Sequence, residues 1–126
     1  MHENVISEYV IGCAIQVHKA IGPGLLESVY EECLAAELEV AGLRFDRQKP
    51  VPVVYRDIKL ECGYRVDFLV EDKVVVDLKA IELVPPVMYA QVLTYARLLD
   101  KRLGLLINFH VERLIDGVRR VVNNLR

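Results

Sequence analysis

The segment VVVDLKAI at positions 74–81 constrains the fold more than any other part of the sequence. It is a nearly continuous run of apolar, mostly β-branched residues that only one acid and one lysine interrupt. Such a run is typical of a central strand, because a strand with one solvated face alternates apolar and polar residues. We therefore expect this strand to lie inside a sheet that helices flank.

Two amphipathic helices precede this strand. Over 5–21 apolar residues recur every three or four positions, and the Gly-Pro-Gly sequence at 22–24 ends the helix. A second helical run contains Glu27 and closes at Ala41 and Gly42. Its predicted apolar stripe consists of Gly22, Leu26, Val29, Cys33, Ala36 and Val40. The short link between the two runs predicts that they pack as a helical hairpin.

The rest of the chain is mostly β in pattern. The pattern predicts two antiparallel strands, one at 50–55 and a longer one over 58–70, joined by a turn at 56–57. A polar turn at 71–73 then leads into the strand at 74–81. Pro85 and Pro86 suit the first turn of a helix that extends to the basic pair Lys101-Arg102. A short apolar strand over 104–109 follows. Residues 118–122 form either another strand or a turn of helix.

These elements predict one domain spanning residues 1–126, in the order α-α-β-β-β-α-β. Its class is α/β (α+β), with helices against a mixed sheet. A chain of 126 residues is close to the commonest size for one domain, and 53% hydrophobic and 27% charged residues are typical of a folded one.

Charge and cysteine content exclude several classes of protein. No window reaches the ~18 apolar residues of a membrane span, so we expect a cytoplasmic protein without a membrane segment. Cys13, Cys33 and Cys62 lack the spacing of a zinc site or disulfide framework, and we expect buried thiols. A net charge of −2 argues against a polycation that grips nucleic acid by bulk charge. Local basic clusters at 44–49 and 113–126 are either solvated faces or a binding surface.

One acid and one lysine of the central strand stand two residues apart. Side chains alternate along a strand, so Asp77 and Lys79 point to the same face. On the preceding strand Asp67 shares a face with Arg65 and Leu69. The turn at 71–73 makes the two strands neighbours, and we expect Asp67 and Asp77 to converge across the hairpin.

Charges inside apolar strands require compensation, because an isolated buried charge costs several kcal/mol. An ordinary salt bridge between Asp77 and Lys79 is one interpretation. A divalent cation is the other, since Mg²⁺ binds one or two carboxylates together with water and phosphate oxygens. Under that interpretation Asp67 and Asp77 are metal ligands, and Lys79 lies beside the phosphate or the attacking water.

The sequence has an aspartate, Asp67, followed about ten residues later by Asp-x-Lys at Asp77 and Lys79. This pattern resembles that of the PD-(D/E)xK nuclease superfamily. The helix after the Asp-x-Lys strand carries Gln91 and Tyr95 one turn apart, which resembles the QxxxY element of RecB-type nucleases. This second resemblance implies that Gln91 and Tyr95 line the active site, where they orient Lys79 and contact phosphate. A buried tyrosine with a glutamine at the helix edge is the structural alternative.

The sequence Gly24-Leu-Leu-Glu27-Ser-Val-Tyr30 resembles the signature of the GxxExxY family, small proteins assigned to the same superfamily. The resemblance covers nearly the whole chain. It implies that Glu27 belongs to the site beside Asp67 and Asp77 as a third metal-binding carboxylate. Glu27 alternatively neutralises the N-terminus of its helix, where an acid is favoured.

These resemblances imply metal-dependent hydrolysis of phosphodiester bonds in nucleic acid, with Mg²⁺ or Mn²⁺ as the cofactor. The partners they imply are DNA or RNA, and a protein partner or a second copy of the chain. The alternative function is a nuclease-fold binding or scaffold module that acts through partners. The small acidic chain favours this alternative, because a free nuclease ordinarily holds its substrate in an electropositive groove.

Overall fold

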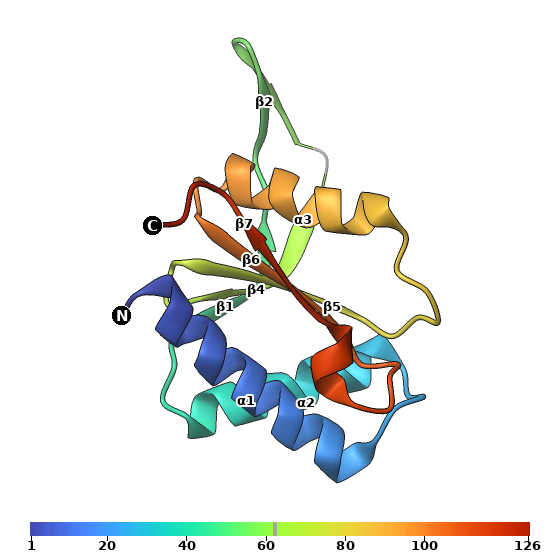
Figure 1. The fold of residues 1–126 in the computed structure, drawn as a ribbon. Helices are drawn as coiled ribbons and strands as arrows, with labels where there is room; N and C mark the ends of the chain where they lie inside the picture. The colour runs from blue at the N-terminus through green and yellow to red at the C-terminus, as the bar shows by residue number, and fades with distance from the viewer. Residues whose placement is uncertain (62) are drawn as a thin grey trace.

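A five-stranded mixed sheet forms the middle layer of the molecule, with helices on both faces (Figure 1). The computed structural model describes residues 1–61 and 63–126. Its elements are α1 (Glu3–Ile21), α2 (Glu27–Val40), β1 (Phe45–Pro50), β2 (Val53–Tyr55), β3 (Ile58–Leu60), β4 (Arg65–Val70), β5 (Val74–Lys79), α3 (Pro86–Leu98), β6 (Leu103–Asn108), the 3-10 helix η1 (Leu114–Gly117) and β7 (Val118–Val122). The pair α1 and α2 covers one face and α3 the other, so the predicted class is confirmed.

The central position of β5 is also confirmed. The strand order is β1-β4-β5-β6-β7, and β5 pairs antiparallel with β4 and parallel with β6. Residues 74–78 are all buried, as expected for a strand covered on both faces. The strand ends at Lys79 rather than at position 81, and the link from β5 to its parallel neighbour β6 runs through α3.

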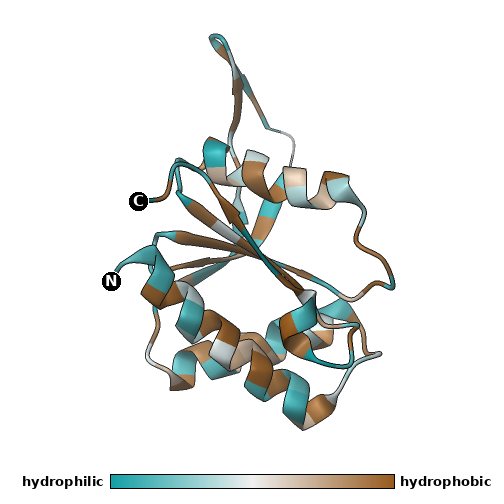
Figure 2. Ribbon diagram, in the orientation of Figure 1, coloured by the Kyte–Doolittle hydropathy of each residue, from teal (hydrophilic) through white to brown (hydrophobic). Residues whose placement is uncertain are grey.

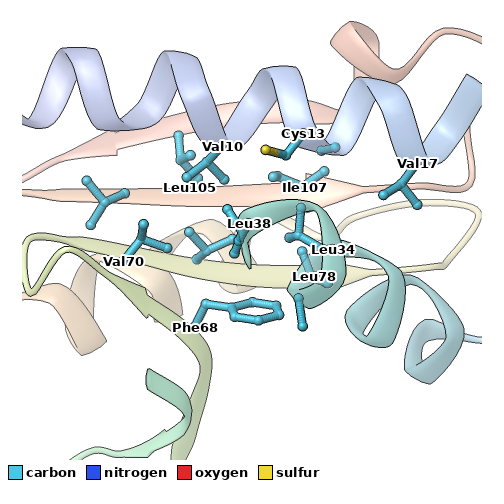
Figure 3. Close-up of a cluster of buried hydrophobic side chains, with 14 of the residues drawn as sticks. Val10, Cys13, Val17, Leu34, Leu38, Phe68, Val70, Leu78, Leu105 and Ile107 are labelled. Atoms are coloured by element: carbon cyan, nitrogen blue, oxygen red, sulfur yellow. The ribbon is translucent and has the colours of Figure 1, made fainter. Parts of the chain in front are cut away.

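The larger core lies between the sheet and the helix pair. Figure 3 shows side chains of α1, α2 and three strands meeting there, including Val10, Cys13, Val17, Leu34, Leu38, Phe68, Val70, Leu78, Leu105 and Ile107. The strands that supply them are predominantly hydrophobic (Figure 2). This burial holds the predicted helical hairpin against the sheet, because apolar area removed from water stabilises by about 25 cal/mol per Å².

The apolar stripe predicted for α2 is wrong. Leu26 and Val40 are 74% and 83% exposed, and the buried face consists of Tyr30, Leu34, Ala35 and Leu38. The Tyr30 ring stacks on Phe109 at 4.4 Å between centroids, and its hydroxyl donates to the Gly22 carbonyl at 2.6 Å. These tertiary contacts decide the orientation of the helix. Glu27, two turns before Leu34, therefore lies on the side of α2 that faces the sheet.

Two strands predicted between α2 and β5 are replaced by four. The predicted segment at 50–55 divides, because β1 ends at Pro50 and β2 begins only after Pro52. The segment predicted at 58–70 contains β3 and β4 as separate strands. β2 and β3 form their own two-stranded sheet, joined by the expected turn, and this hairpin projects beyond α3 (Figure 1). β1 instead extends the main sheet beside β4.

Other boundaries agree more closely with the sequence. The strand expected over 104–109 is β6, which begins one residue earlier, and residues 118–122 form the edge strand β7. α3 begins at Pro86 as predicted but ends at Leu98, short of the basic pair. Cys13 and Cys33 are free cysteines, buried and half-buried, and Cys62 lies outside the described residues. Among the described residues, none of the helices has the length and apolar character to cross a membrane.

A close contact between α3 and β6 generates the first prediction. A Cβ atom at Gly104 would lie 2.5 Å from Cγ1 of the buried Val92. Gly104→Ala is expected to lower the free energy of unfolding by about 1–3 kcal/mol, because the core must overpack. Gly12→Ala is the control, since nothing surrounds that position on α1. It should stabilise by up to about 1 kcal/mol in the same urea titration. Equal effects of both changes would contradict the packing argument.

Candidate active site

The carboxylates of Asp67 and Asp77 meet where the pairing of β4 and β5 ends. The ladder runs from Val70 opposite Val74 to Phe68 opposite Val76. Beyond it, the Asp67 amide donates to Oδ1 of Asp77 at 3.2 Å. The Leu78 amide donates to Oδ2 of Asp67 at 2.7 Å. Each side chain thus occupies the position of a backbone partner on the opposite strand. The predicted convergence of the two acids is confirmed.

A glutamine on β1 also binds Asp67. Gln48 has φ of 51°, which is uncommon for a residue with a side chain, and it lies between the paired positions Arg47 and Lys49. Its Nε2 donates to Oδ1 of Asp67 at 3.2 Å and to Oε1 of Glu31 at 2.6 Å. Gln48 therefore connects α2 to the acid pair. Sequence reasoning missed this residue, because no local pattern marks a glutamine that only the pairing of β1 with β4 brings to Asp67.

The Glu31 carboxylate is held in turn by Arg47. Arg47 Nη2 lies 2.6 Å from Oε2 of Glu31 and 2.7 Å from Oε1 of Glu32. This arginine belongs to the basic cluster at 44–49, and it forms ion pairs with two glutamates of α2. For Arg47, the structure therefore supports neither a freely solvated side chain nor a free cation for binding.

Burial raises the pKa values of both central acids. Desolvation, opposed by the hydrogen bond from Leu78 and reinforced by the charge of Asp77, raises the pKa of Asp67 to about 6. Desolvation likewise raises the pKa of Asp77, although the Asp67 amide and the charge of Lys79 oppose the increase. Two carboxylates that are close together and partly removed from water favour a proton or a cation between them.

Lys79 and Glu27 lie at the border of this pair. The charge of Lys79 lowers the pKa values of both Asp77 and Glu27. Desolvation, followed by the charge of Asp67, raises the pKa of Glu27 overall. The structure therefore brings the predicted Glu27, Asp67, Asp77 and Lys79 within electrostatic range of one another. Glu27 itself is largely exposed, at the start of α2.

Asn108 fixes the chain where it leaves β5, and the sequence did not single it out. This buried side chain accepts from the Ile81 amide at 3.2 Å and donates to the Ile81 carbonyl at 2.8 Å. Its own strand position pairs with Lys79. The Phe109 amide donates to the Lys79 carbonyl at 2.9 Å. These bonds hold the Lys79 backbone firmly at the edge of the site.

Gln91 and Tyr95 approach the acids from the other layer. Tyr95 is buried against Leu69 and Val75 in the smaller core. Desolvation and then the charge of Asp77 raise its pKa, while the neighbouring Gln91 side chain opposes the increase. The predicted pair is therefore together on one face of α3, with Tyr95 near Asp77. α2 and α3 thus both contribute to one end of the β4–β5 hairpin.

The carboxylate oxygens of Asp67 and Asp77 are the type of ligand that a hard divalent cation prefers, but they do not form a complete coordination shell. Among the described residues, no group of three or more His, Cys, Asp or Glu side chains is arranged to hold a metal ion. Asp67 and Asp77 nevertheless supply two adjoining oxygen ligands, and Mg²⁺ commonly takes one or two carboxylates and keeps several waters. The raised pKa values indicate that the backbone hydrogen bonds and the charge of Lys79 do not fully compensate the burial of this pair.

Comparison with known proteins agrees with this geometry. Residues 4–121 match the sequence profile described as the PD-(D/E)XK nuclease superfamily. No curated protein and no solved structure gives a significant match. The match covers nearly the whole chain, so this protein belongs to the PD-(D/E)XK nuclease superfamily, whose members generally use divalent metals.

The raised pKa of Asp67 predicts how stability depends on pH. Below about pH 4 the carboxyl is protonated in both folded and unfolded chains, so its contribution is zero. Between about pH 4 and its folded pKa of about 6, it ionises more readily in the unfolded chain. In EDTA the free energy of unfolding should therefore fall by about 1–2 kcal/mol over this range, after allowance for solvent screening.

Asp67→Asn should remove that part of the pH dependence. Denaturant titrations between pH 4 and 7 compare it with the native chain and with the exposed control Asp100→Asn. A native chain and an Asp67→Asn variant with parallel stability profiles would contradict the raised pKa.

The Gln48 bridge gives a separate prediction. Gln48→Ala removes a hydrogen bond to the ionised form of Asp67, so the pKa of Asp67 should rise further. An NMR titration of the side-chain carboxyl carbon measures this directly. Gln16→Ala, an exposed glutamine of α1, is the matched control. An unchanged Asp67 pKa in the Gln48 variant would show that the bridge has no electrostatic role.

Proposed function

We propose that this protein is a metal-dependent nuclease that hydrolyses phosphodiester bonds of nucleic acid at the Asp67–Asp77–Lys79 centre. The observation that carries the proposal is the pair of carboxylates at the end of the β4–β5 ladder, each held by a backbone amide of the opposite strand. Membership of the nuclease superfamily gives this pair its chemical context. A purely structural salt bridge between Asp77 and Lys79 would not require Asp67, because burial of this second carboxylate is unfavourable.

Asp67 and Asp77 are the proposed ligands for Mg²⁺ or Mn²⁺, and Glu27 is the proposed third carboxylate. When bound, such an ion lowers the pKa of a coordinated water and neutralises charge on the phosphate. Glu27 lies at the first turn of α2. Its raised pKa, which Asp67 helps to cause, supports its role as the third carboxylate.

Lys79 is the proposed group that positions or deprotonates the attacking water. Its place beside Asp77, together with the rigid backbone between β5 and Asn108, supports this role. Gln91 and Tyr95 orient Lys79 and the phosphate in the proposed site. The location of both residues one turn apart on α3 and the position of Tyr95 near Asp77 support this arrangement, and with it the RecB-type subgroup.

Membership of the GxxExxY family is also proposed. The signature residues have connected roles in the structure: Tyr30 is buried, and its hydroxyl accepts from the Leu25 amide at 3.1 Å within the same motif. This contact fixes the loop before α2 and thereby the position of Glu27. The glycine-rich loop, the buried Tyr30 and Glu27 at the start of α2 therefore form one local unit.

The test of catalysis uses substitutions that keep side-chain size where possible. Asp77→Asn and Lys79→Ala should each reduce cleavage of labelled single- and double-stranded DNA and RNA at least about a hundredfold with Mg²⁺ or Mn²⁺. EDTA should abolish cleavage. Asp100→Asn and Lys19→Ala remove the same charges from exposed sites and should leave the rate unchanged. Cleavage that survives both substitutions at the centre would overturn the mechanism.

Calorimetry separates the nuclease from the scaffold alternative. Divalent binding that Asp67→Asn and Asp77→Asn both weaken supports the metal centre. If the protein binds no divalent ion through these residues and cleaves nothing, the nuclease-fold scaffold becomes the function that remains.

A further inference from the structure

Two adjoining hollows lie where residues of the β2–β3 hairpin approach α3. The hairpin stands clear of the body of the molecule, past one side of α3 (Figure 1). One hollow, of about 690 Å³, is lined by the basic residues Lys49, Lys59 and Arg65. The other, of about 390 Å³, has mostly apolar walls that include Val53 and α3. Tyr64 lines both hollows, so they adjoin at this side chain, and the two together are called the groove.

This groove leads to the candidate active site. Gln91 and Tyr95 line its apolar part. The rings of Tyr64 and Tyr95 lie 6.1 Å apart between centroids. At the basic end, Arg65 stands two residues before Asp67 on β4 and donates to the Gln48 carbonyl at 3.1 Å. The groove lining therefore includes a neighbour of each acid, with Arg65 near Asp67 along β4 and Tyr95 near Asp77.

The charge of the basic hollow differs from that of the chain as a whole. The chain has a net charge of −2, whereas three cationic side chains and one acid, Glu61, line this hollow. Within the part of the chain that the structure describes, Lys49, Lys59 and Arg65 form no ion pair, in contrast to Arg47. Their charges are available to an anionic ligand.

The aromatic wall of the groove is accessible. The Tyr64 side chain is 49% exposed at the boundary between the basic and the apolar hollow. Exposed aromatic rings beside free cations suit a strand of nucleic acid, because bases stack on the rings while phosphates contact the cations. A duplex presents phosphates at its surface but keeps its bases stacked inside. The apolar hollow therefore favours unpaired bases.

We infer that this groove binds a single-stranded segment of nucleic acid and directs it to the acid pair. Lys49, Lys59 and Arg65 contact the phosphates, and an unpaired base stacks on Tyr64 against the α3 wall. The inference rests on the proposed function for its orientation toward cleavage. It accounts for how a chain of negative net charge holds a polyanion, since the cations are concentrated where the strand enters.

Binding without cleavage is measured on the Asp77→Asn variant in EDTA. Fluorescence anisotropy compares labelled oligo-dT, oligo-U and a DNA duplex of the same length at several salt concentrations. Either single strand should bind more tightly than the duplex, and the two single-stranded arms distinguish DNA from RNA. Joint Lys49→Gln and Lys59→Gln changes should weaken binding and reduce the dependence of log K on log salt by about 0.7 per charge.

The stacking contact has its own matched variants. Tyr64→Ala should weaken single-strand binding about tenfold, whereas Tyr64→Phe should retain it. Tyr9→Ala and Lys19→Gln serve as controls, since both residues are exposed on α1, across the sheet from the groove. Binding that responds equally to the groove variants and to these controls would overturn the inference.

The outcomes separate the groove from the nuclease proposal. Native protein that cleaves nucleic acid while the groove variants bind normally would refute the groove and leave the nuclease intact. Groove-dependent binding with neither cleavage nor divalent binding through Asp67 and Asp77 would support the groove and refute the nuclease. Sedimentation of the same variants tests whether a second copy of the chain occupies the groove instead. If the groove variants only convert a dimer to monomer and leave oligonucleotide binding unchanged, the surface joins two copies and the inference is wrong.

Discussion

The candidate site depends on the mutual placement of Asp67 and Asp77 between β4 and β5. Each carboxylate accepts a hydrogen bond from a backbone amide of the opposite strand, at the point where the regular ladder stops. The turn after Val70 sets the register that makes this possible. A slip of one residue would direct one acid to the opposite face of the sheet. The acid pair and the hairpin register are therefore one constraint, and burial of the pair is tolerated because backbone donors partly compensate it.

The surrounding layers meet at this point. α2 reaches the acids through Glu27 and the Glu31–Gln48 bridge, and α3 reaches them through Tyr95. The close packing of α3 on β6 at Gly104 fixes the position of α3 and therefore that of Tyr95. Central β5 is buried between both layers, so its polar end is where side chains from both faces can converge. The groove beside the hairpin extends the same site outward, because Tyr64 contacts the ring of Tyr95.

Much of this arrangement follows from local sequence. The apolar run at 74–81 predicts a central strand, and alternation places Asp77 and Lys79 on one face. The turn at 71–73 predicts that Asp67 meets Asp77. The prolines at 85 and 86 predict the start of α3, and helical spacing puts Gln91 beside Tyr95. Each of these inferences uses residues close in sequence, or joined by one short turn, so the geometry of a single strand, helix or hairpin is sufficient.

The sequence by itself determined the residue types of the candidate site, namely two acids, a lysine and a Gln-Tyr pair on neighbouring elements. Only the tertiary structure decided which face of α2 is buried, that β1 joins the sheet beside β4, and that Gln48 and Asn108 support the acids and Lys79. α2 has apolar residues on several sides, so its sequence does not define which face is buried. The stacking of Tyr30 on Phe109 decides this in the folded protein. A polar strand such as β1 carries no periodic signal, because its place depends on hydrogen bonds to a distant partner rather than on its own hydrophobicity.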